Sequence, residues 1–220
     1  MNGIKMTRGS SPSGSFLALF AEYFNGIMPA FNPSKGLLMK KNVPQRQKKI
    51  PENLVLIGMF GSGKSTIGRL LAQKLRYHFV DVDHLIEGKY KMPLQKVLDK
   101  LGMKGFMRME DEALQVLQYR HCVIAPGGSA VYYPKGMRQL KKLGPCVFLK
   151  VELAELQKRM PNWSNRGVVC RGGETLTALY KERAPLFKKY ADFTIETKNR
   201  TAAKIAKEIL ESLQQDGPAR

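Results

Sequence analysis

The stretch Leu56–Thr66, LIGMFGSGKST, constrains the fold of this chain more than any other. It contains the phosphate-loop pattern G-x-x-x-x-G-K-[ST], which runs from Gly58 to Ser65. Its backbone N–H groups converge on phosphates, Lys64 reaches the β- and γ-oxygens, and Ser65 offers a hydroxyl to magnesium. The motif therefore predicts a bound nucleoside triphosphate. It leaves open whether the phosphate passes to water, a protein, a nucleic acid or a small molecule.

The sequence around the loop supplies the strand and helix that such a loop requires. Residues 53–58, NLVLIG, are a short apolar run typical of a buried parallel strand. Apolar residues at helical spacing follow the loop from Ile67 to Leu75. Similar patterns predict strands at residues 78–83, 121–126, 145–151 and 191–197, and helices at 94–101, 106–119 and after Thr201. This alternation predicts an α/β fold of three layers, with a five-stranded parallel sheet covered by helices on both faces.

Composition and charge place the chain among globular proteins. Its 220 residues, 43% apolar and 25% charged, suit one domain with additional segments. The formal net charge is +19, and residues 1–50 hold 8 Lys/Arg against 1 Asp/Glu, so the basic excess extends along the whole chain. Such a surface attracts anions of many kinds. Because no helix-turn-helix, zinc-finger or RNP-like pattern is present, we do not expect a nucleic-acid partner.

The composition also suggests domain boundaries. We expect residues 1–50 to be a basic, poorly ordered extension, residues 51–215 to form the folded domain, and residues 216–220 to be a tail. The apolar stretch 15–31 is interrupted by Glu22 and is too short to span a bilayer. A weak amphipathic anchor or targeting segment is the alternative for this stretch. We expect a cytoplasmic location, since the spacing of the cysteines predicts reduced thiols at Cys122, Cys146 and Cys170. We also expect the protein to be a monomer.

Two carboxylates and a pair of glycines follow two of the predicted strands. Asp81 and Asp83 are two residues apart, so they would share one face of a strand at its carboxyl end. Ligands bind at that end in open α/β sheets. One carboxylate can help to hold magnesium, and the other can orient a hydroxyl and accept its proton. Gly127 and Gly128 would let the backbone approach a ligand closely. The alternatives are two solvated carboxylates and a plain turn.

Taken in order, these motifs resemble the shikimate kinase family. They are the phosphate loop, F-x-D-x-D, G-x-x-x-F-x-x-x-E, G-G and R-x-P-[LIVM]-[FY], and together they cover about residues 53–213. That family has the P-loop fold of the nucleoside-monophosphate-kinase-like group. It transfers the γ-phosphate of ATP to the ring 3-hydroxyl of shikimate, with magnesium, in aromatic amino acid biosynthesis. The resemblance implies an ATP- and Mg²⁺-dependent small-molecule kinase with a lid near residues 160–174.

The resemblance also implies roles for individual residues. Asp81 would act through magnesium and its waters, and Asp83 would bind the substrate's hydroxyls and serve as the base. Arg166 in the lid would reach the transferring phosphoryl group. Arg183 would clamp the substrate carboxylate, a task that suits its planar fork. The resemblance further assigns the ATP phosphates to Gly58, Gly61, Ser62, Gly63, Lys64, Ser65 and Thr66, adenine to Arg159, and the substrate pocket to Phe106, Glu110, Gly127 and Gly128.

Three departures from the family pattern are visible. Met107 stands where the family has a second carboxylate-binding arginine, and Arg108 comes one residue late, about 100° further around a helix. Losing this carboxylate-binding arginine weakens the free energy of substrate binding by about 1.5–3 kcal/mol unless Arg108 or Lys104 replaces it. Ser129 replaces a glycine and is expected to crowd the substrate. Gly167 replaces a proline and loosens the lid.

The departures at Met107 and Ser129 fall on the acceptor side, whereas the ATP side matches the family pattern apart from the stiffness of the lid. Shikimate is the leading candidate. The alternatives are another small hydroxy acid or hydroxy amino acid, a nucleotide acceptor, or a nucleotide-binding protein without kinase activity and with a basic surface.

Overall fold

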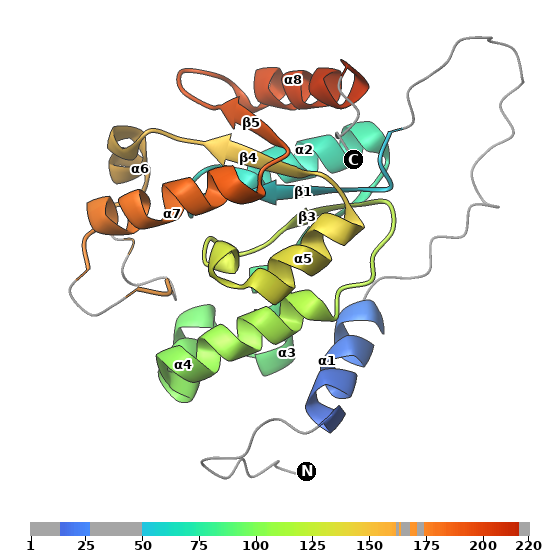
Figure 1. Ribbon diagram of the computed structural model, residues 1–220, viewed down its shortest axis with the longest axis vertical. Helices are drawn as coiled ribbons and strands as arrows, with labels where there is room; N and C mark the ends of the chain where they lie inside the picture. Colours follow the sequence, from blue (N-terminus) through green and yellow to red (C-terminus); the bar gives the residue numbers. More distant parts are fainter. Residues whose placement is uncertain (1–13, 27–49, 162, 164–167, 171–173, 216–220) are drawn as a thin grey trace, which may run out of the picture.

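The computed structural model describes residues 14–26, 50–161, 163, 168–170 and 174–215, and its core is a parallel sheet (Figure 1). The strand order is β2-β3-β1-β4-β5, and every neighbouring pair is parallel. The strands are β1 (Asn53–Ile57), β2 (His78–Asp81), β3 (Cys122–Ala125), β4 (Cys146–Lys150) and β5 (Phe193–Glu196). The predicted α/β fold with a five-stranded parallel sheet is therefore confirmed.

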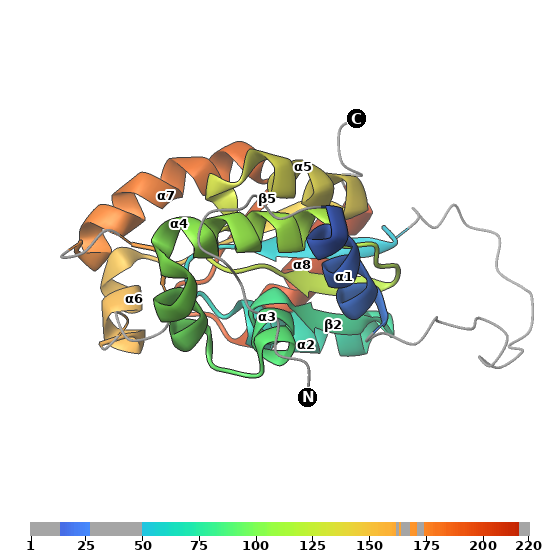
Figure 2. The same ribbon diagram turned by 90° about the horizontal axis from the view of Figure 1, so that it is seen from below.

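Helices cover both faces of the sheet, which gives the three predicted layers (Figure 2). One face carries α2 (Lys64–Leu75) and α8 (Ala202–Gln215), and the other carries α4 (Leu94–Gln115), α5 (Pro134–Leu143) and α7 (Leu176–Tyr190). Shorter helices lie at the ends of the strands: α3 (Val82–Tyr90), the 3₁₀ turn η2 (Ala130–Tyr132) and α6 (Leu153–Arg159). Each face has its own buried apolar cluster.

The central strand explains why the site forms where it does. All five residues of β1 are buried, because β1 lies between β3 and β4 and helices cover both of its faces. The chain passes from β1 to β2 on one side and later reaches β4 on the other side. Crevices at the carboxyl ends of strands open at such a reversal of strand order, and ligands bind there. The phosphate loop leaves β1 at this point.

The second strand is shorter than predicted, and this corrects the expected placement of the two carboxylates. β2 ends at Asp81, and Val82 begins α3, which the sequence analysis missed. Asp81 is the N-cap residue, with φ −101° and ψ 112°, and Asp83 lies in the first turn of the helix. Carboxylates are favourable at a helix N-terminus, which carries a partial positive charge. Asp81 and Asp83 therefore do not share the face of a strand.

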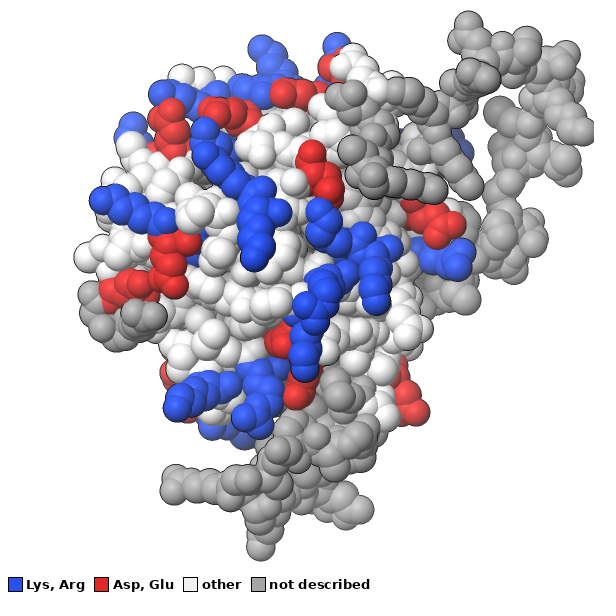
Figure 3. Space-filling view, viewed as in Figure 1, with Lys and Arg blue, Asp and Glu red and all other residues white. Residues whose placement is uncertain are grey.

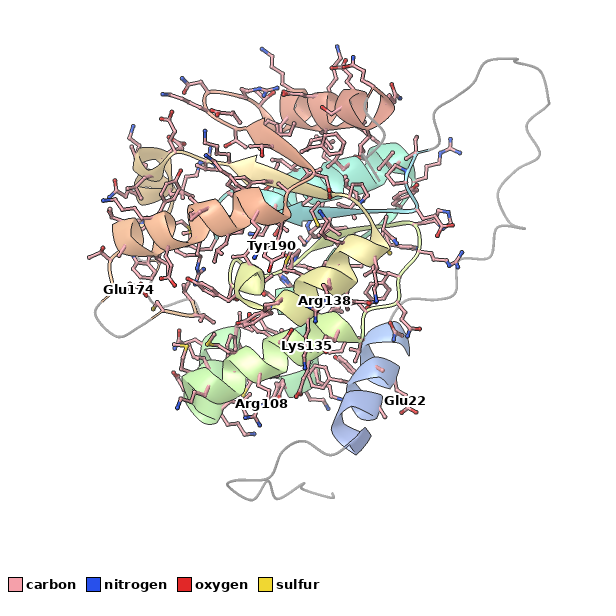
Figure 4. The ribbon with its side chains drawn as sticks, in the orientation of Figure 1. Glu22, Arg108, Lys135, Arg138, Glu174 and Tyr190 are labelled. Atoms are coloured by element: carbon pink, nitrogen blue, oxygen red, sulfur yellow. The ribbon has the colours of Figure 1, made fainter. Side chains whose placement is uncertain are left out.

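The expectation that residues 1–50 are poorly ordered is wrong for residues 14–26. They form helix α1 (Gly14–Gly26), which packs beside α3 and α4 (Figure 1). Phe20 and Phe24 are 0% exposed and stack with ring centroids 4.8 Å apart. They are four residues apart and so lie on one side of the helix, whereas Glu22 is exposed (Figure 4). The sequence analysis treated Glu22 as an interruption, but it lies on the polar side.

Polar contacts also fasten α1. The Asn25 side chain donates to the carbonyl oxygen of Val116 at 3.1 Å and accepts from the Gln118 amide at 3.1 Å, just beyond the end of α4. The Tyr119 hydroxyl donates to the carbonyl of Phe24. These contacts satisfy backbone groups that the end of a helix leaves unpaired. Residues 1–13, 27–49 and 216–220 lie outside the described part of the chain, so the rest of the predicted extension and the tail stays a prediction.

The surface is basic over several helices. Lys and Arg side chains cross the face drawn in Figure 3 over α5, where Lys135, Arg138 and Lys142 are exposed. Acidic side chains lie among basic ones elsewhere on this face (Figure 3). On the face shown in Figure 3, basic side chains are thus spread over the surface, in agreement with their distribution along the sequence. Among the described helices, none has the length and apolar character to cross a bilayer.

Candidate active site

A cavity of about 470 Å³ opens where β1, β2 and β3 end. Its wall combines the phosphate loop, the start of α3, the turn after β3, Met160, Val168 and Val169 of the predicted lid, and Arg183 from α7. Segments far apart in the sequence therefore meet at one place. Of the residues predicted for the site, Gly61, Lys64, Ser65, Asp81, Asp83, Glu110, Gly127, Gly128 and Arg183 line this cavity.

The phosphate loop has the shape of an anion cradle. Gly61 and Gly63 have φ of +73° and +92°, which a side chain would strain. A Cβ atom on Gly61 would also lie 2.6 Å from Cγ of Met160. The buried Oγ of Ser62 has no hydrogen-bond partner among the described residues. A glycine loop at the N-terminus of α2 fits a phosphate ligand, which its backbone N–H groups can bind.

Lys64 is held by the loop itself. Its Nζ donates to the carbonyl oxygens of Gly58 and Met59, both at 3.0 Å. Burial lowers the pKa of Lys64, while the negative charges of Asp83 and Asp81 act against this effect. The ammonium group thus lies between the loop and the two carboxylates. A cation in that position can bridge the phosphates of a nucleotide to the reacting groups.

Ser65 and Asp81 form a pair of oxygen ligands beside Lys64. The Oγ of Ser65 donates to Oδ2 of Asp81 at 2.9 Å, and Oδ1 of Asp81 lies 3.4 Å from Nδ1 of His84. Magnesium prefers oxygen ligands, and it is usually held by one or two protein groups together with substrate phosphates. Among the described residues, no group of three or more His, Cys, Asp or Glu side chains could form a complete protein-built metal site. The pair fits magnesium bound together with nucleotide phosphates.

Asp83 faces the cavity from the first turn of α3. Its Oδ1 is buried and has no hydrogen-bond partner among the described residues. Burial raises the pKa of Asp83 to about 6, and the charge of Asp81 adds to this, while Lys64 opposes it. A Cβ atom on Gly127 would lie only 2.7 Å from this Oδ1, so glycine is needed for the turn to pass so close. The arrangement leaves a basic carboxylate available to a hydroxyl in the cavity.

Glu110 lies behind Asp83 and is 5% exposed. Its carboxyl oxygens accept from Oγ of Ser129 at 2.9 and 2.8 Å and from the Tyr133 hydroxyl. Burial raises the pKa of Glu110 to about 8, and the charge of Asp83 adds to this. The hydroxyl of Ser129 is therefore committed to Glu110. The sequence led us to expect that the Ser129 side chain crowds the substrate, and this expectation is wrong for its hydroxyl, which is bonded to Glu110 instead.

Arg183 closes the cavity from α7 and is only 1% exposed. Its Nε donates to the Tyr132 hydroxyl at 3.1 Å, and its Nη2 donates to the carbonyl of Val169. Its Nη1 lies 3.4 Å from the position that a Cβ atom on Gly128 would take. The guanidinium is thus fixed on two sides and faces the glycine turn on the third.

The structure leaves some predicted residues out of the cavity wall. Phe106 is 0% exposed and belongs to the apolar core, so it supports the pocket from behind. Arg159 is exposed and donates to the carbonyl of Gly61 at 3.3 Å, beside the phosphate loop. Gly58, Ser62, Gly63 and Thr66 belong to the loop or the first turn of α2 without lining the cavity. Arg166 and Gly167 lie outside the described residues.

Arg108 does not take the place of the missing arginine. It is exposed on the outer side of α4 (Figure 4), and Lys104 is exposed as well. Met107 is half-buried against the apolar core, and none of these three residues lines the cavity. The expected rotation of about 100° between neighbouring helix positions explains the difference between Met107 and Arg108. The cavity wall therefore contains one arginine among the described residues.

Sequence reasoning missed three aromatic residues near the site. Tyr132 and Tyr133 supply hydroxyls to Arg183 and Glu110. Trp163 stacks on Phe60 of the phosphate loop, with ring centroids 5.7 Å apart. The adjacent tyrosines directly after the glycine turn were a visible signal. Their partners, however, lie on α7 and α4, and no local pattern identifies them.

Comparisons with known proteins agree with this geometry. The family model described as shikimate kinase matches residues 60–214. Curated shikimate kinases from Nitrosomonas europaea and Moorella thermoacetica are 31% and 35% identical over 169 and 167 residues. These alignments cover 76% and 75% of this chain, and 80% and 96% of the relatives.

Solved structures give the same result. The shikimate kinase of Acinetobacter baumannii in complex with shikimate is similar with a TM-score of 0.69 and 32% sequence identity, covering 76% of this chain and 94% of that chain. The shikimate kinase of Aquifex aeolicus has a TM-score of 0.61 and 28% identity, covering 73% and 95%. The fold, the site and the matched sequence agree: this chain belongs to the shikimate kinase family.

Proposed function

We propose that this chain transfers the γ-phosphoryl group of ATP to a hydroxyl of shikimate. The observation that carries the proposal is that Asp83 shares one cavity with Lys64, Arg183 and the glycine turn. A phosphate-binding group, a base and an anion-binding group are thereby brought together. These are the parts that phosphoryl transfer to a small hydroxy acid requires.

The donor side would be built from the phosphate loop. Backbone N–H groups of the loop would bind the phosphates, and Lys64 would exchange its contacts with the loop carbonyls for phosphate oxygens. Ser65 and Asp81 would hold magnesium, which neutralises charge on the phosphates when it is bound. Arg159 lies beside Gly61, which supports its predicted position near the nucleotide.

The acceptor side would be built around Asp83. Its carboxylate would accept a hydrogen bond from the acceptor hydroxyl and then take up the proton as the hydroxyl oxygen attacks the γ-phosphorus. A pKa of about 6 leaves this carboxylate ionised at neutral pH and more basic than an ordinary aspartate. The turn at Gly127 and Gly128 would place backbone groups against the substrate, and Arg183 would bind its carboxylate.

The single arginine in the described cavity wall also favours a second candidate for the acceptor. Met107 removes a carboxylate-binding group that the family pattern contains, so another small hydroxy acid with one carboxylate fits the same set of contacts. Action as a monomer stays a prediction. A cytoplasmic location stays a prediction from the free cysteines.

The test is ADP release by the purified full chain with Mg²⁺·ATP and a panel of acceptors. The panel is shikimate, quinate, gluconate, hydroxy amino acids and nucleoside monophosphates. We expect shikimate to give the highest kcat/KM, and Lys64→Ala and Asp83→Asn to lower it by at least about 10²-fold. Arg138→Ala changes an exposed residue of α5 and serves as the control. Higher turnover of another acceptor would replace shikimate, and unchanged turnover in Asp83→Asn would remove Asp83 as the base.

A further inference from the structure

The turn after the glycine pair carries three hydroxyl side chains that the phosphoryl-transfer argument does not use. Ser129, Tyr132 and Tyr133 lie within or next to η2. Two of these hydroxyls reach Glu110 on α4, and the third reaches Arg183 on α7. This short segment therefore touches two of the ionisable groups that line the cavity.

The turn is firmly anchored. Ser129 and Tyr133 are each 5% exposed, and both donate to Glu110. Between them, Ala130 and Val131 are each 2% exposed within the apolar core. A segment held by buried hydrogen bonds and close packing has few alternative positions. Tyr132 therefore projects from a rigid support.

Tyr132 holds Arg183 by two contacts. Its hydroxyl accepts from Nε of Arg183 at 3.1 Å, and its ring lies 4.9 Å from Cζ of the guanidinium. The first contact fixes the rotation of the guanidinium, because Nε carries only one hydrogen. The second adds a cation–π attraction, which is strongest where water is excluded. Arg183 is 1% exposed, so water offers its guanidinium little competition.

The remaining N–H groups of Arg183 suit a carboxylate. A guanidinium has five N–H donors, of which one on Nε is used by Tyr132 and one on Nη2 by the carbonyl of Val169. Both hydrogens on Nη1 and one on Nη2 have no partner among the described residues. One from each Nη atom can meet the two oxygens of a carboxylate in a bidentate pair. Nη1 lies beside Gly128, so this pair would form inside the cavity.

We propose that Tyr132 is a positioning residue for the acceptor: it fixes Arg183 so that this one guanidinium binds the acceptor carboxylate in the absence of an arginine at position 107. The inference rests on the proposed function, because it requires an acceptor that carries a carboxylate. Its physical basis is preorganisation. An arginine that is already held in the binding geometry loses little side-chain entropy when the ligand arrives.

The test measures binding of shikimate and of its methyl ester, which lacks the negative charge. Trp163 is the chain's single tryptophan and stacks on Phe60 at the cavity wall, so its fluorescence can report ligand binding. Tyr132→Phe keeps the ring and removes the hydroxyl. The matched control is Tyr190→Phe, the same change at the C-terminal end of the helix that carries Arg183 (Figure 4).

We expect Tyr132→Phe to weaken shikimate binding roughly tenfold, which corresponds to about 1.4 kcal/mol, and to leave methyl shikimate binding within about twofold. Tyr190→Phe should change the dissociation constant of neither shikimate nor methyl shikimate. The KM for ATP should stay the same in both variants. In an Arg183→Lys background, Tyr132→Phe should cause no additional loss of shikimate affinity, since the effect of Tyr132 passes through Arg183. A purely structural defect would weaken the binding of both ligands, and its effect on affinity would add to that of Arg183→Lys.

Three results separate the possible failures. In the first, wild type binds shikimate, and Tyr132→Phe either leaves the affinity for both ligands unchanged or lowers both affinities equally. The positioning role is then overturned, and the proposed function stands. If wild type itself binds shikimate no better than the methyl ester, no carboxylate clamp exists, and the inference is overturned. If wild type also fails to phosphorylate shikimate, the proposed function is lost as well.

Discussion

The most quantitative prediction concerns Glu110, whose carboxyl group lies buried between Asp83 and two hydroxyl donors. Burial and the charge of Asp83 raise its pKa from 4.5 to about 8, although the hydrogen bonds from Tyr133 and Ser129 oppose the rise. The folded protein therefore keeps this carboxyl protonated at neutral pH. The unfolded chain releases the proton, because an exposed glutamate ionises near pH 4.5.

The sign of the effect follows from proton linkage. Between pH 4.5 and about 8 the folded state binds one more proton at Glu110 than the unfolded state, so the free energy of unfolding falls as pH rises. The slope is about 1.4 kcal/mol per pH unit, which amounts to roughly 4 kcal/mol over three pH units. Glu110→Gln keeps the shape and an acceptor oxygen but has no proton to lose. The variant should therefore lack this part of the slope.

The assay is urea unfolding of wild type and Glu110→Gln in parallel at pH 5, 6, 7 and 8. Contributions from titrating groups far from Glu110 are common to both proteins and cancel in the difference. The stability of the variant relative to wild type should rise by about 1 kcal/mol or more for each pH unit. A difference that stays constant over this range would show that Glu110 is not held protonated in the fold.

Three further predictions test other parts of the structure. Phe24→Ala empties a fully buried site on α1 and should lower the free energy of unfolding by about 3–5 kcal/mol in urea melts, whereas Glu22→Ala on the exposed side should stay within about 0.5 kcal/mol. Met107→Arg should tighten shikimate binding roughly tenfold, because position 107 lies one helical turn before a residue of the cavity wall, while Arg108→Ala should leave it unchanged in the same titration. Ser65→Ala should raise the Mg²⁺ concentration for half-maximal activity roughly tenfold, and an unchanged metal requirement would remove its hydroxyl from the metal site.

The donor side could be predicted from the sequence because it depends on neighbouring residues. The apolar run of β1, the glycines with positive φ and Lys64 are contiguous, and each restricts the next. The order of strands and helices is similarly local, since apolar periodicity identifies each element in turn. The number and direction of the strands therefore followed from the sequence.

The remaining features depend on contacts between distant segments. The alternation of Asp81, Val82 and Asp83 suits a strand, but the chain turns into α3 at this point. The burial of Phe24 depends on a surface formed by α3 and α4, about sixty to ninety residues further on. The partner of Tyr132 lies on α7, so the clamp around Arg183 becomes visible only in three dimensions. Such side-chain partners are not encoded in a local pattern.

The most direct test of the central claim is mass spectrometry of the acceptor after incubation of the full chain with Mg²⁺·ATP and shikimate. The account predicts shikimate that carries one added phosphoryl group, formed in equal amount to ADP, and absent when Asp83→Asn replaces wild type. ADP formed without phosphorylated shikimate, or no consumption of ATP while the folded chain binds nucleotide, would contradict it.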